Sequence, residues 1–381
     1  MRFYSLDVFR GATVALMILV NNPGSWKFMY APLKHAPWHG CTPTDLVFPF
    51  FLFAVGNALS FVMPRLQQEG TAAFWKKVIK RSLLIFLIGL LLNWSPFVKW
   101  NGEVLQFKTF ENLRIMGVLQ RIALSYFFAS VLVFFTGQRG AFFSGTLLLL
   151  FYWILCLGLG APGDPYSLQG WFGTRLDIAL LGETHLYKGE GTPFDPEGLL
   201  STFAPITQVI FGYLVGDYIQ QKGKTYEMLT SLFVVGTLLT ATGLAWDTVF
   251  PINKKIWTSS YTLYTTGLAI YTLALMIYFM EFRNVKGWLG SFFNAFGKNP
   301  LFIFVLSGFL PRALDLIRIP AGVATDGSTR YIGPFKWYYE TVCKNIPGIP
   351  ENGSLFYAVT LIVFYWGICY WLDRKKIYIK V

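Results

Sequence analysis

Long apolar runs separated by short polar stretches dominate the pattern of residues along the chain. A helix that crosses a bilayer needs about 20 mostly apolar residues, and runs of this kind recur from the first residues to the last. We therefore predict an all-α fold, a polytopic transmembrane helix bundle that forms one domain over residues 1–381. Ten spanning helices are expected at about residues 6–22, 44–63, 82–99, 113–135, 141–159, 201–220, 228–247, 258–280, 299–317 and 355–372.

The ninth of these runs is interrupted near its start. Lys298, Asn299 and Pro300 separate it from the preceding stretch, GWLGSFFNAF at 288–297. Aromatic residues and small residues alternate with few charges in that stretch, so we expect it to lie along the membrane interface as an amphipathic piece.

Composition supports a membrane protein. The chain is 54% hydrophobic and only 14% charged, with a mean hydropathy of +0.47, whereas a soluble domain carries about 25% charged residues. The net charge of +12 is spread between the apolar runs, which is typical of orientation signals and argues against a nucleic-acid partner. Membrane lipid is the expected surrounding. Asp7 and Arg10 interrupt the first apolar run, so it is not expected to be a cleaved signal peptide.

The short basic loops predict the orientation. Residues 65–81 hold five basic residues and one acid, and the tail after residue 372 is also basic. Such loops stay on the cytoplasmic side, and an even number of spans then places both termini there, in the cell (inner) membrane. The segments 22–43, 160–200, 248–257 and 318–354 would face out, and 160–200 carries six acids.

The four cysteines do not have the spacing of a metal site, and no metal is expected. Cys156 and Cys369 lie inside apolar runs and are predicted to be packing residues. Cys41 and Cys343 both lie in loops predicted to face out. A disulfide between them is therefore possible, but nothing else in the sequence supports it.

Candidate chemistry is concentrated between Asp7 and Gly56. Two apolar runs bracket a short loop that contains His35 and His39, two of the chain's three histidines. Imidazole titrates near neutral pH and serves as a general base or nucleophile. We predict that His35 is the catalytic group, although a loop histidine is more often simply solvated.

Two polar residues of the first run should share one helix face. Arg10 and Asn21 are eleven residues apart, which is three helical turns and about 16 Å of rise. Asn21 is therefore expected at the outer mouth, as a catalytic hydrogen-bond donor. Arg10 either pairs locally with Asp7 or binds an anionic ligand from inside.

Asp45 has a structural and a catalytic interpretation that are compatible. Thr42, Pro43, Thr44 and Asp45 match a capped helix start, with Thr42 as the N-cap and the acid at N3. A carboxylate on the first turn projects toward the loop of His35, where it would fix the imidazole tautomer.

Four basic residues are candidates for binding an anionic cofactor. Arg114 and Arg121 are two turns apart and predicted on one face of the helix at 113–135. An arginine inside an apolar run must face the bundle interior, where it either clamps a phosphate or forms a structural ion pair. Arg10 and Lys254 are the other two, and Lys254 is the weaker signal because it lies beside a predicted helix end.

Several stretches resemble the heparan-alpha-glucosaminide N-acetyltransferase family. They are SLDVFRG, LVNN, KHAPWHG and TDLVFPFFLFAVG within 5–56, GVLQRIALSYF (117–127), DPEGLLST (195–202), PINKKIWTSSY (251–261) and FFNAFGKNP (292–300). The resemblance implies a multi-pass transferase that moves the acetyl group of cytosolic acetyl-CoA, its co-substrate, to a glucosamine amine across the membrane. It places the active-site histidine on His35, the loop-entry asparagine on Asn21 and the acid on Asp45. His39 stands where the family pattern has asparagine.

We therefore expect a transmembrane acetyltransferase with an amino-sugar or glycan acceptor. An O-acetyltransferase of an envelope polysaccharide keeps the chemistry and changes the acceptor. A transporter or exporter is the alternative from another class, but the chain lacks paired interrupted helices at matching positions in two halves. The sequence leaves open the acceptor, the acyl group and the oligomeric state, for which a homodimer is one option.

Overall fold

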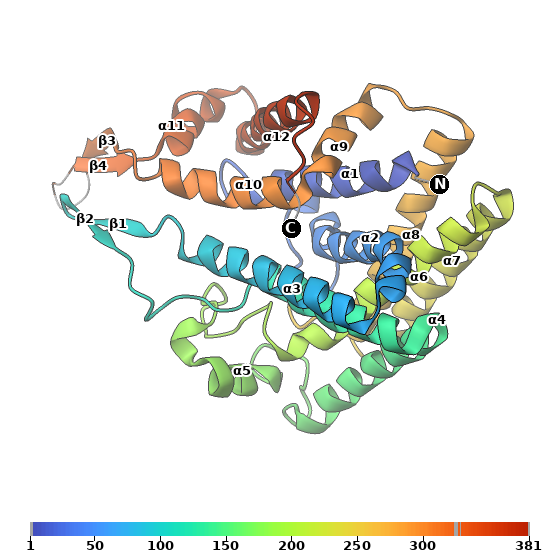
Figure 1. Ribbon diagram of the computed structural model, residues 1–381. Helices are drawn as coiled ribbons and strands as arrows, with labels where there is room; N and C mark the ends of the chain where they lie inside the picture. Colours follow the sequence, from blue (N-terminus) through green and yellow to red (C-terminus); the bar gives the residue numbers. More distant parts are fainter. Residues whose placement is uncertain (1–2, 324–326, 328, 380–381) are drawn as a thin grey trace.

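Helices make up most of the computed structural model, which describes residues 3–323, 327 and 329–379 (Figure 1). Twelve α-helices lie in these residues. They are α1 (Tyr4–Asn21), α2 (Val47–Glu69), α3 (Thr71–Trp94), α4 (Val118–Leu159), α5 (Gly173–Leu181), α6 (Phe203–Lys222), α7 (Tyr226–Asp247), α8 (Ser259–Ile277), α9 (Trp288–Lys298), α10 (Pro300–Leu314), α11 (Pro334–Thr341) and α12 (Pro350–Arg374). The predicted all-α, polytopic class is therefore the observed one.

Two small antiparallel hairpins accompany the helices. Strand β1 (Val98–Asn101) pairs with β2 (Val104–Phe107), and β3 (Ile319–Val323) pairs with β4 (Thr329–Ile332). Both lie at the end of the bundle opposite the N-terminus (Figure 1). Helix α3 ends at Trp94, before the hairpin at 98–107, so the predicted helix at 82–99 extends past the observed end.

Six helices in the described residues are long and apolar enough to cross a membrane, or seven if the bent pair α9 and α10 forms one span. The prediction of ten stays a prediction. The 42-residue α4 is two helices that meet at Gly137, whose φ of 66° is not helical, and Figure 1 shows it folding back there. It thus contains most of the predicted runs 113–135 and 141–159. The bend between α9 and α10 is 79°, which agrees with the predicted interruption at Lys298 to Pro300.

Apolar side chains on the outer helices face away from the protein. Only 22% of the most apolar window of α4 is buried, and the corresponding values are 28% for α7 and 33% for α12. Exposed apolar surface of this extent needs a lipid environment. The chain is an integral membrane protein.

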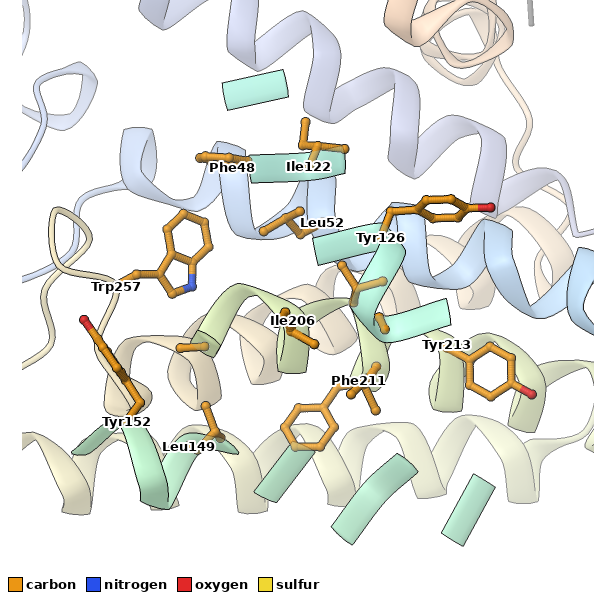
Figure 2. Close-up of a cluster of buried hydrophobic side chains, with 14 of the residues drawn as sticks. Phe48, Leu52, Ile122, Tyr126, Leu149, Tyr152, Ile206, Phe211, Tyr213 and Trp257 are labelled. Atoms are coloured by element: carbon orange, nitrogen blue, oxygen red, sulfur yellow. The ribbon is translucent and has the colours of Figure 1, made fainter. Parts of the chain in front are cut away.

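The largest core cluster joins α2, α4 and α6. Phe48 and Leu52 of α2 belong to one buried cluster with Ile122 and Tyr126 of α4 and Ile206 of α6 (Figure 2). The same cluster includes Trp257, which precedes α8. Helix α2, which follows the histidine loop, is thereby fixed in the middle of the bundle.

Glycines let α2 and α6 approach closely. A Cβ added at Gly212 would lie 2.2 Å from the carbonyl oxygen of Phe53, and one at Gly56 would lie 2.1 Å from that of Val209. Backbone oxygens cannot move aside as a flexible side chain does, so any larger residue forces the helices apart.

We expect Gly212→Leu to lower the apparent melting temperature by several degrees and to reduce the yield of folded protein. Gly367→Leu is the matched control, because a Cβ at this exposed glycine of α12 meets nothing within 4 Å. Thermal unfolding of both purified variants measures the difference. Equal melting temperatures would contradict close packing of α2 on α6.

Candidate active site

The loop of His35 is held on the start of α2 by a capped turn. Thr42 is the N-cap of a short 3-10 helix, Pro43–Leu46, and its side chain and that of Asp45 form a capping box. The Oγ1 atom of Thr42 also donates a hydrogen bond to the carbonyl oxygen of Lys34 at 2.7 Å. The predicted cap is confirmed, and it places the carboxylate of Asp45 directly beneath the loop.

Asp45 contacts His35 as the sequence predicted. Its Oδ1 lies 2.6 Å from Nδ1 of His35, while Oδ2 accepts hydrogen bonds from the backbone N–H of Ala36 and Thr42, each at 3.0 Å. The side chain of Asp45 is 1% exposed, whereas that of His35 is 40% exposed. A buried carboxylate thus supports an imidazole that solvent reaches.

These contacts determine which nitrogen of His35 carries the proton. Asp45 receives several donors on Oδ2, which favours the ionised carboxylate. A carboxylate oxygen 2.6 Å from Nδ1 then requires a hydrogen on Nδ1. The neutral imidazole therefore has its lone pair on Nε2, which forms no hydrogen bond within the described part of the chain. Nε2 is positioned to act as a base or nucleophile.

The side chain of Lys254 lies beside His35. Its Nζ is 3.0 Å from Nδ1 of His35 and 3.4 Å from Oδ1 of Asp45. The segment before α8 is held there by a bridge in which the N–H of Gly40 donates to the carbonyl oxygen of Ile252 at 2.7 Å. Burial lowers the pKa of Lys254, and the carboxylate of Asp45 opposes this shift. Sequence reasoning proposed Lys254 for cofactor binding and gave no reason to place it beside His35.

Asn21 and His35 line one cavity of about 160 Å³, here called the histidine cavity. Lys254 and Glu197 also line it. Asn21 is the last residue of α1, and its place at the outer mouth stays a prediction. The three predicted catalytic residues, His35, Asp45 and Asn21, are therefore brought together.

Glu197 is a residue of the histidine cavity that sequence reasoning missed. In the sequence it is one of six acids of the 160–200 segment, and it lies in the DPEGLLST stretch that carries part of the family resemblance. Arg114 holds this stretch through ion pairs with both Asp195 and Glu197. The hydrogen bond from Nε of Arg114 to Oδ2 of Asp195 measures 2.9 Å.

The prediction that Arg114 and Arg121 share one face of a helix is wrong. Helix α4 begins only at Val118, because the side-chain amide of Asn93 binds the carbonyl oxygens of Arg114 and Met116, at 2.9 and 3.0 Å, and keeps this backbone extended. The carboxylates that pair with Arg114 raise the pKa of its guanidinium, against the opposing effect of burial.

Arg121 is fully buried in α4 and contacts the same stretch. Its Nη2 donates to the carbonyl oxygen of Gly198 at 3.1 Å and to Oγ of Ser201, and its guanidinium carbon lies 5.3 Å from the centre of the Trp257 ring. These contacts suit a residue that positions the segment carrying Glu197.

Asp177 binds this stretch from α5. Its Oδ1 accepts the N–H of Leu199 at 3.0 Å, and Oδ2 has no hydrogen-bond partner in the described residues. Burial raises the pKa of Asp177 to about 7, with a further contribution from Asp195. The folded protein therefore binds a proton at Asp177 that the unfolded chain releases near pH 4.

It follows that stability should fall as the pH rises from about 4 to 7 and level off above that value. Asp177→Asn keeps the acceptor for Leu199 and cannot ionise, so we expect a higher apparent melting temperature at pH 8 and a smaller decline between pH 4 and 7. Thermal unfolding between pH 4 and 8 measures these melting temperatures, and the control is Asp164→Asn, the same substitution at an exposed acid. A variant less stable than the parent at pH 8 would contradict the raised pKa.

Arg10 lies in the N-terminal half of α1. Its Nη2 forms an ion pair with Asp7 at 2.7 Å, which confirms the predicted local pair, and its Nε donates to the carbonyl oxygen of Gly297 at 2.8 Å. Arg10 also lines two cavities. The larger, here the Arg10 cavity, holds about 510 Å³ between α1 and α2. The smaller, here the Arg81 cavity, holds about 100 Å³ and is also lined by Arg81 and Phe51.

The cavities form a series along α1. The Arg10 and Arg81 cavities share Arg10, and the Arg81 and histidine cavities share Phe51. A fourth cavity of about 480 Å³, here the Gln120 cavity, shares Asn21 with the histidine cavity. Arg10 and Asn21 thus face the same series, as predicted from their spacing.

The structure places the rival histidine and the two loop cysteines. His39 does not line the histidine cavity, and its Nδ1 lies 3.4 Å from the side-chain amide of Asn253. Cys41 and Cys343 are both free thiols, so the disulfide left open by the sequence is not formed. Burial raises the pKa of Cys41 to about 12, with a further contribution from Asp45.

Comparison with known proteins identifies the family of the chain. Residues 2–169 match the family described as heparan-alpha-glucosaminide N-acetyltransferase, catalytic. The chain is 30% identical over 315 residues to the mouse protein heparan-alpha-glucosaminide N-acetyltransferase and 29% identical over 313 residues to the human protein of that name. Each match covers 68% of this chain and 46% of the relative, so the chain spans about half the length of these relatives. The chain belongs to the heparan-alpha-glucosaminide N-acetyltransferase family.

Proposed function

We propose that the protein transfers the acetyl group of cytoplasmic acetyl-CoA to the amine of a glucosamine-type sugar on the outer face of the cell membrane. The observation that carries this proposal is the position of the His35–Asp45 pair beside a series of cavities that follows α1. The mouse and human relatives are named as N-acetyltransferases of a glucosaminide, which supports the same reaction class.

The length of the cavity series suits transfer across a membrane. Phe3 lines its first cavity, and Trp26, beyond the end of α1, lines its last. The 18 residues of α1 rise about 27 Å, close to the roughly 30 Å of a hydrocarbon core. A charged nucleotide cannot cross that core, whereas an extended pantetheine arm can thread between helices and bring a thioester to His35.

The donor would enter from the Arg10 end. Arg10 and Arg81 line the cavities there, and guanidinium groups suit the phosphates of acetyl-CoA. Arg114 and Arg121 were also candidates for this role, but their contacts with Asp195, Glu197 and Gly198 favour positioning of the acidic stretch. Lys254, at the histidine, is better placed to act on the acetyl end of the donor.

Two routes of transfer fit the geometry. In the first, Nε2 of His35 removes the proton of the amine while the amine nitrogen attacks the thioester carbonyl; the C–S bond then breaks and the CoA thiolate takes up a proton. In the second, Nε2 attacks the carbonyl and the C–S bond breaks, so that CoA leaves as a thiolate and takes up a proton from water. The amine then attacks the acetyl group on Nε2, the N–C bond to the imidazole breaks, and the amine releases one proton to water. Asn21 would donate to the oxyanion in either route, a contribution of about 3–4 kcal/mol to the barrier.

The experiment that tests the function uses the protein reconstituted in vesicles. Labelled acetyl-CoA is supplied on the side of the basic loops, and a panel of amino sugars is supplied on the other side. We expect labelled N-acetyl sugar only on the second side. A rapid acid quench without acceptor separates the routes, since only the second leaves label on the protein. No labelled product with any amino sugar would contradict the proposed function.

The orientation has its own test. Single cysteines at Ser167 and Gln68, in a background without the four natural cysteines, should react with an impermeant maleimide from opposite sides of the membrane. Ser167 is expected to be accessible from outside and Gln68 from the cytoplasm. Labelling of both from one side would remove the need for transfer across the membrane.

A further inference from the structure

Lys254 is an amine on the wall of the histidine cavity. It lines this cavity together with His35 and Asn21, and its side chain is 21% exposed. The cavity holds about 160 Å³, which is less than the roughly 300–1,000 Å³ of a site for a whole small molecule. This part of the cavity series therefore fits the reacting groups, and an acetyl thioester that reaches His35 lies against Lys254 as well.

The backbone of Lys254 is fixed by a buried turn before α8. The N–H of Asn253 donates to Oγ1 of Thr258, and the N–H of Thr258 donates to the carbonyl oxygen of Asn253, each at 3.0 Å. Inside this closed pair, the N–H of Trp257 donates to the carbonyl oxygen of Lys254 at 3.1 Å. The turn leaves the side chain of Lys254 as its mobile part, so the amine stays at the cavity wall.

The neighbouring Lys255 has different surroundings. Its Nζ forms an ion pair with Oε2 of Glu190 at 2.6 Å and lies 5.6 Å from the centre of the Trp38 ring. Lys255 does not line the histidine cavity. Of these two adjacent lysines, Lys254 is the one that faces the place to which the acetyl group of the donor is brought.

The surroundings of Lys254 favour the neutral amine, which is the form that attacks a thioester. Burial lowers the pKa of Lys254, against the opposing effects of the carboxylates of Asp45 and Glu197. Desolvated lysines act as nucleophiles for this reason. The Nζ atom lies 3.0 Å from Nδ1 of His35. Rotation about the flexible lysine side chain therefore brings it to a carbonyl carbon beside Nε2 of the same ring.

We propose that Lys254 is a self-acetylation site, which takes the acetyl group of acetyl-CoA when no acceptor occupies the histidine cavity. The ammonium group first releases a proton to water, and the neutral Nζ then attacks the carbonyl carbon of the thioester. The C–S bond breaks, and the CoA thiolate takes up the proton that Nζ loses as the amide forms. The products are N-acetyllysine and CoA. This inference rests on the proposed function for the entry of the donor.

Acetylation of Lys254 should inactivate the site. It removes the positive charge of Nζ, which lies 3.4 Å from Oδ1 of Asp45, and it leaves an acetyl group in the small cavity where the donor places its own. An amide is far less reactive than a thioester, so the group stays on the lysine. Donor without acceptor thus turns the transferase off, whereas an acceptor amine in the cavity takes the acetyl group first.

Mass spectrometry of the reconstituted full-length protein tests the site. The protein is incubated with labelled acetyl-CoA alone for far longer than one turnover, treated with hydroxylamine to remove acetyl groups from imidazole and thiol groups, and digested. We expect about one acetyl group per chain on Lys254 and less than a tenth of that on Lys255. Glucosamine in the incubation should reduce the label on Lys254 at least tenfold.

The rate of transfer is measured after this incubation, once the first acetyl-CoA has been removed and both substrates are supplied. The initial rate of the unaltered protein should fall in proportion to the label on Lys254. Lys254→Arg keeps a positive charge near Asp45 without a nucleophilic amine, so the rate that it retains should not fall during the incubation. The matched control is Lys255→Arg, which should be labelled and inactivated as the unaltered protein is.

The outcomes separate this inference from the proposed function. An unlabelled Lys254 in the unaltered protein overturns self-acetylation, whether or not amino sugars are acetylated, and this measurement needs no variant to fold. Equal label on Lys254 and Lys255 also overturns it, because it indicates non-specific reaction of lysines with the thioester. Selective label on Lys254 without transfer to any amino sugar supports the site and contradicts only the function.

Discussion

His35→Ala is expected to abolish acetyl transfer while acetyl-CoA still binds. The substitution removes Nε2, the only atom of the His35–Asp45–Lys254 group that the geometry leaves ready to take a proton or an acetyl group. A general base typically contributes about 10²–10⁴ in rate, and loss of a nucleophile costs at least as much. The donor phosphates are expected near Arg10, three helical turns before Asn21 on α1, so the affinity for acetyl-CoA should change little.

His39→Asn is the matched control, since it replaces the neighbouring histidine with the residue that the family pattern has there. His39 is outside the histidine cavity and contacts Asn253 rather than Asp45, so near-normal rates are expected. Steady-state kinetics with acetyl-CoA and glucosamine, and direct binding of acetyl-CoA, measure both variants. An active His35→Ala beside an inactive His39→Asn would move the site to His39. Full activity in both would place the chemistry elsewhere.

The pairing of His35 with Asp45 was predictable because its causes are local. Thr42, Pro43 and Asp45 specify a capped helix start in four consecutive residues, and the side chain at N3 of such a start points back along the loop. Arg10 and Asn21 both line the series of cavities, and this too follows from their spacing on one helix. The length of the apolar runs also located most of the long helices, including the two halves of α4.

The missed parts depend on contacts between distant segments. Lys254 reaches His35 from 219 residues away, through the bridge between Gly40 and Asn253, and no local pattern indicates that approach. Glu197 reaches the histidine cavity because Arg114 holds its stretch. The apolar run predicts a helix that includes Arg114, but the side-chain amide of Asn93 donates to the carbonyl oxygens of Arg114 and Met116, and the helix begins after them.

Lys254 adds a charge whose effect on the site follows from these distances. An ammonium group 3.4 Å from Oδ1 of Asp45 stabilises the carboxylate, and the carboxylate in turn holds the proton on Nδ1 of His35. Without Asp45, Lys254 could donate directly to Nδ1, 3.0 Å away, and the proton of the neutral ring would move to Nε2. The carboxylate is therefore what keeps the reactive nitrogen free.

We accordingly expect Asp45→Asn to be nearly as damaging as loss of the histidine, with a rate reduced by about 10²–10⁴. The amide oxygen of the variant can take the place of Oδ2 and keep the hydrogen bonds from Ala36 and Thr42, so the loop should stay folded. The amide nitrogen then faces Nδ1 as a donor, which leaves Nε2 protonated and unable to act. Ring nitrogen NMR of ¹⁵N-labelled His35 should show the exchange of tautomers, and activity should fall with unchanged melting temperature. Asp164→Asn, the same change at an exposed acid, controls for loss of charge. An active Asp45→Asn with the proton still on Nδ1 would mean that the carboxylate serves only as the helix cap.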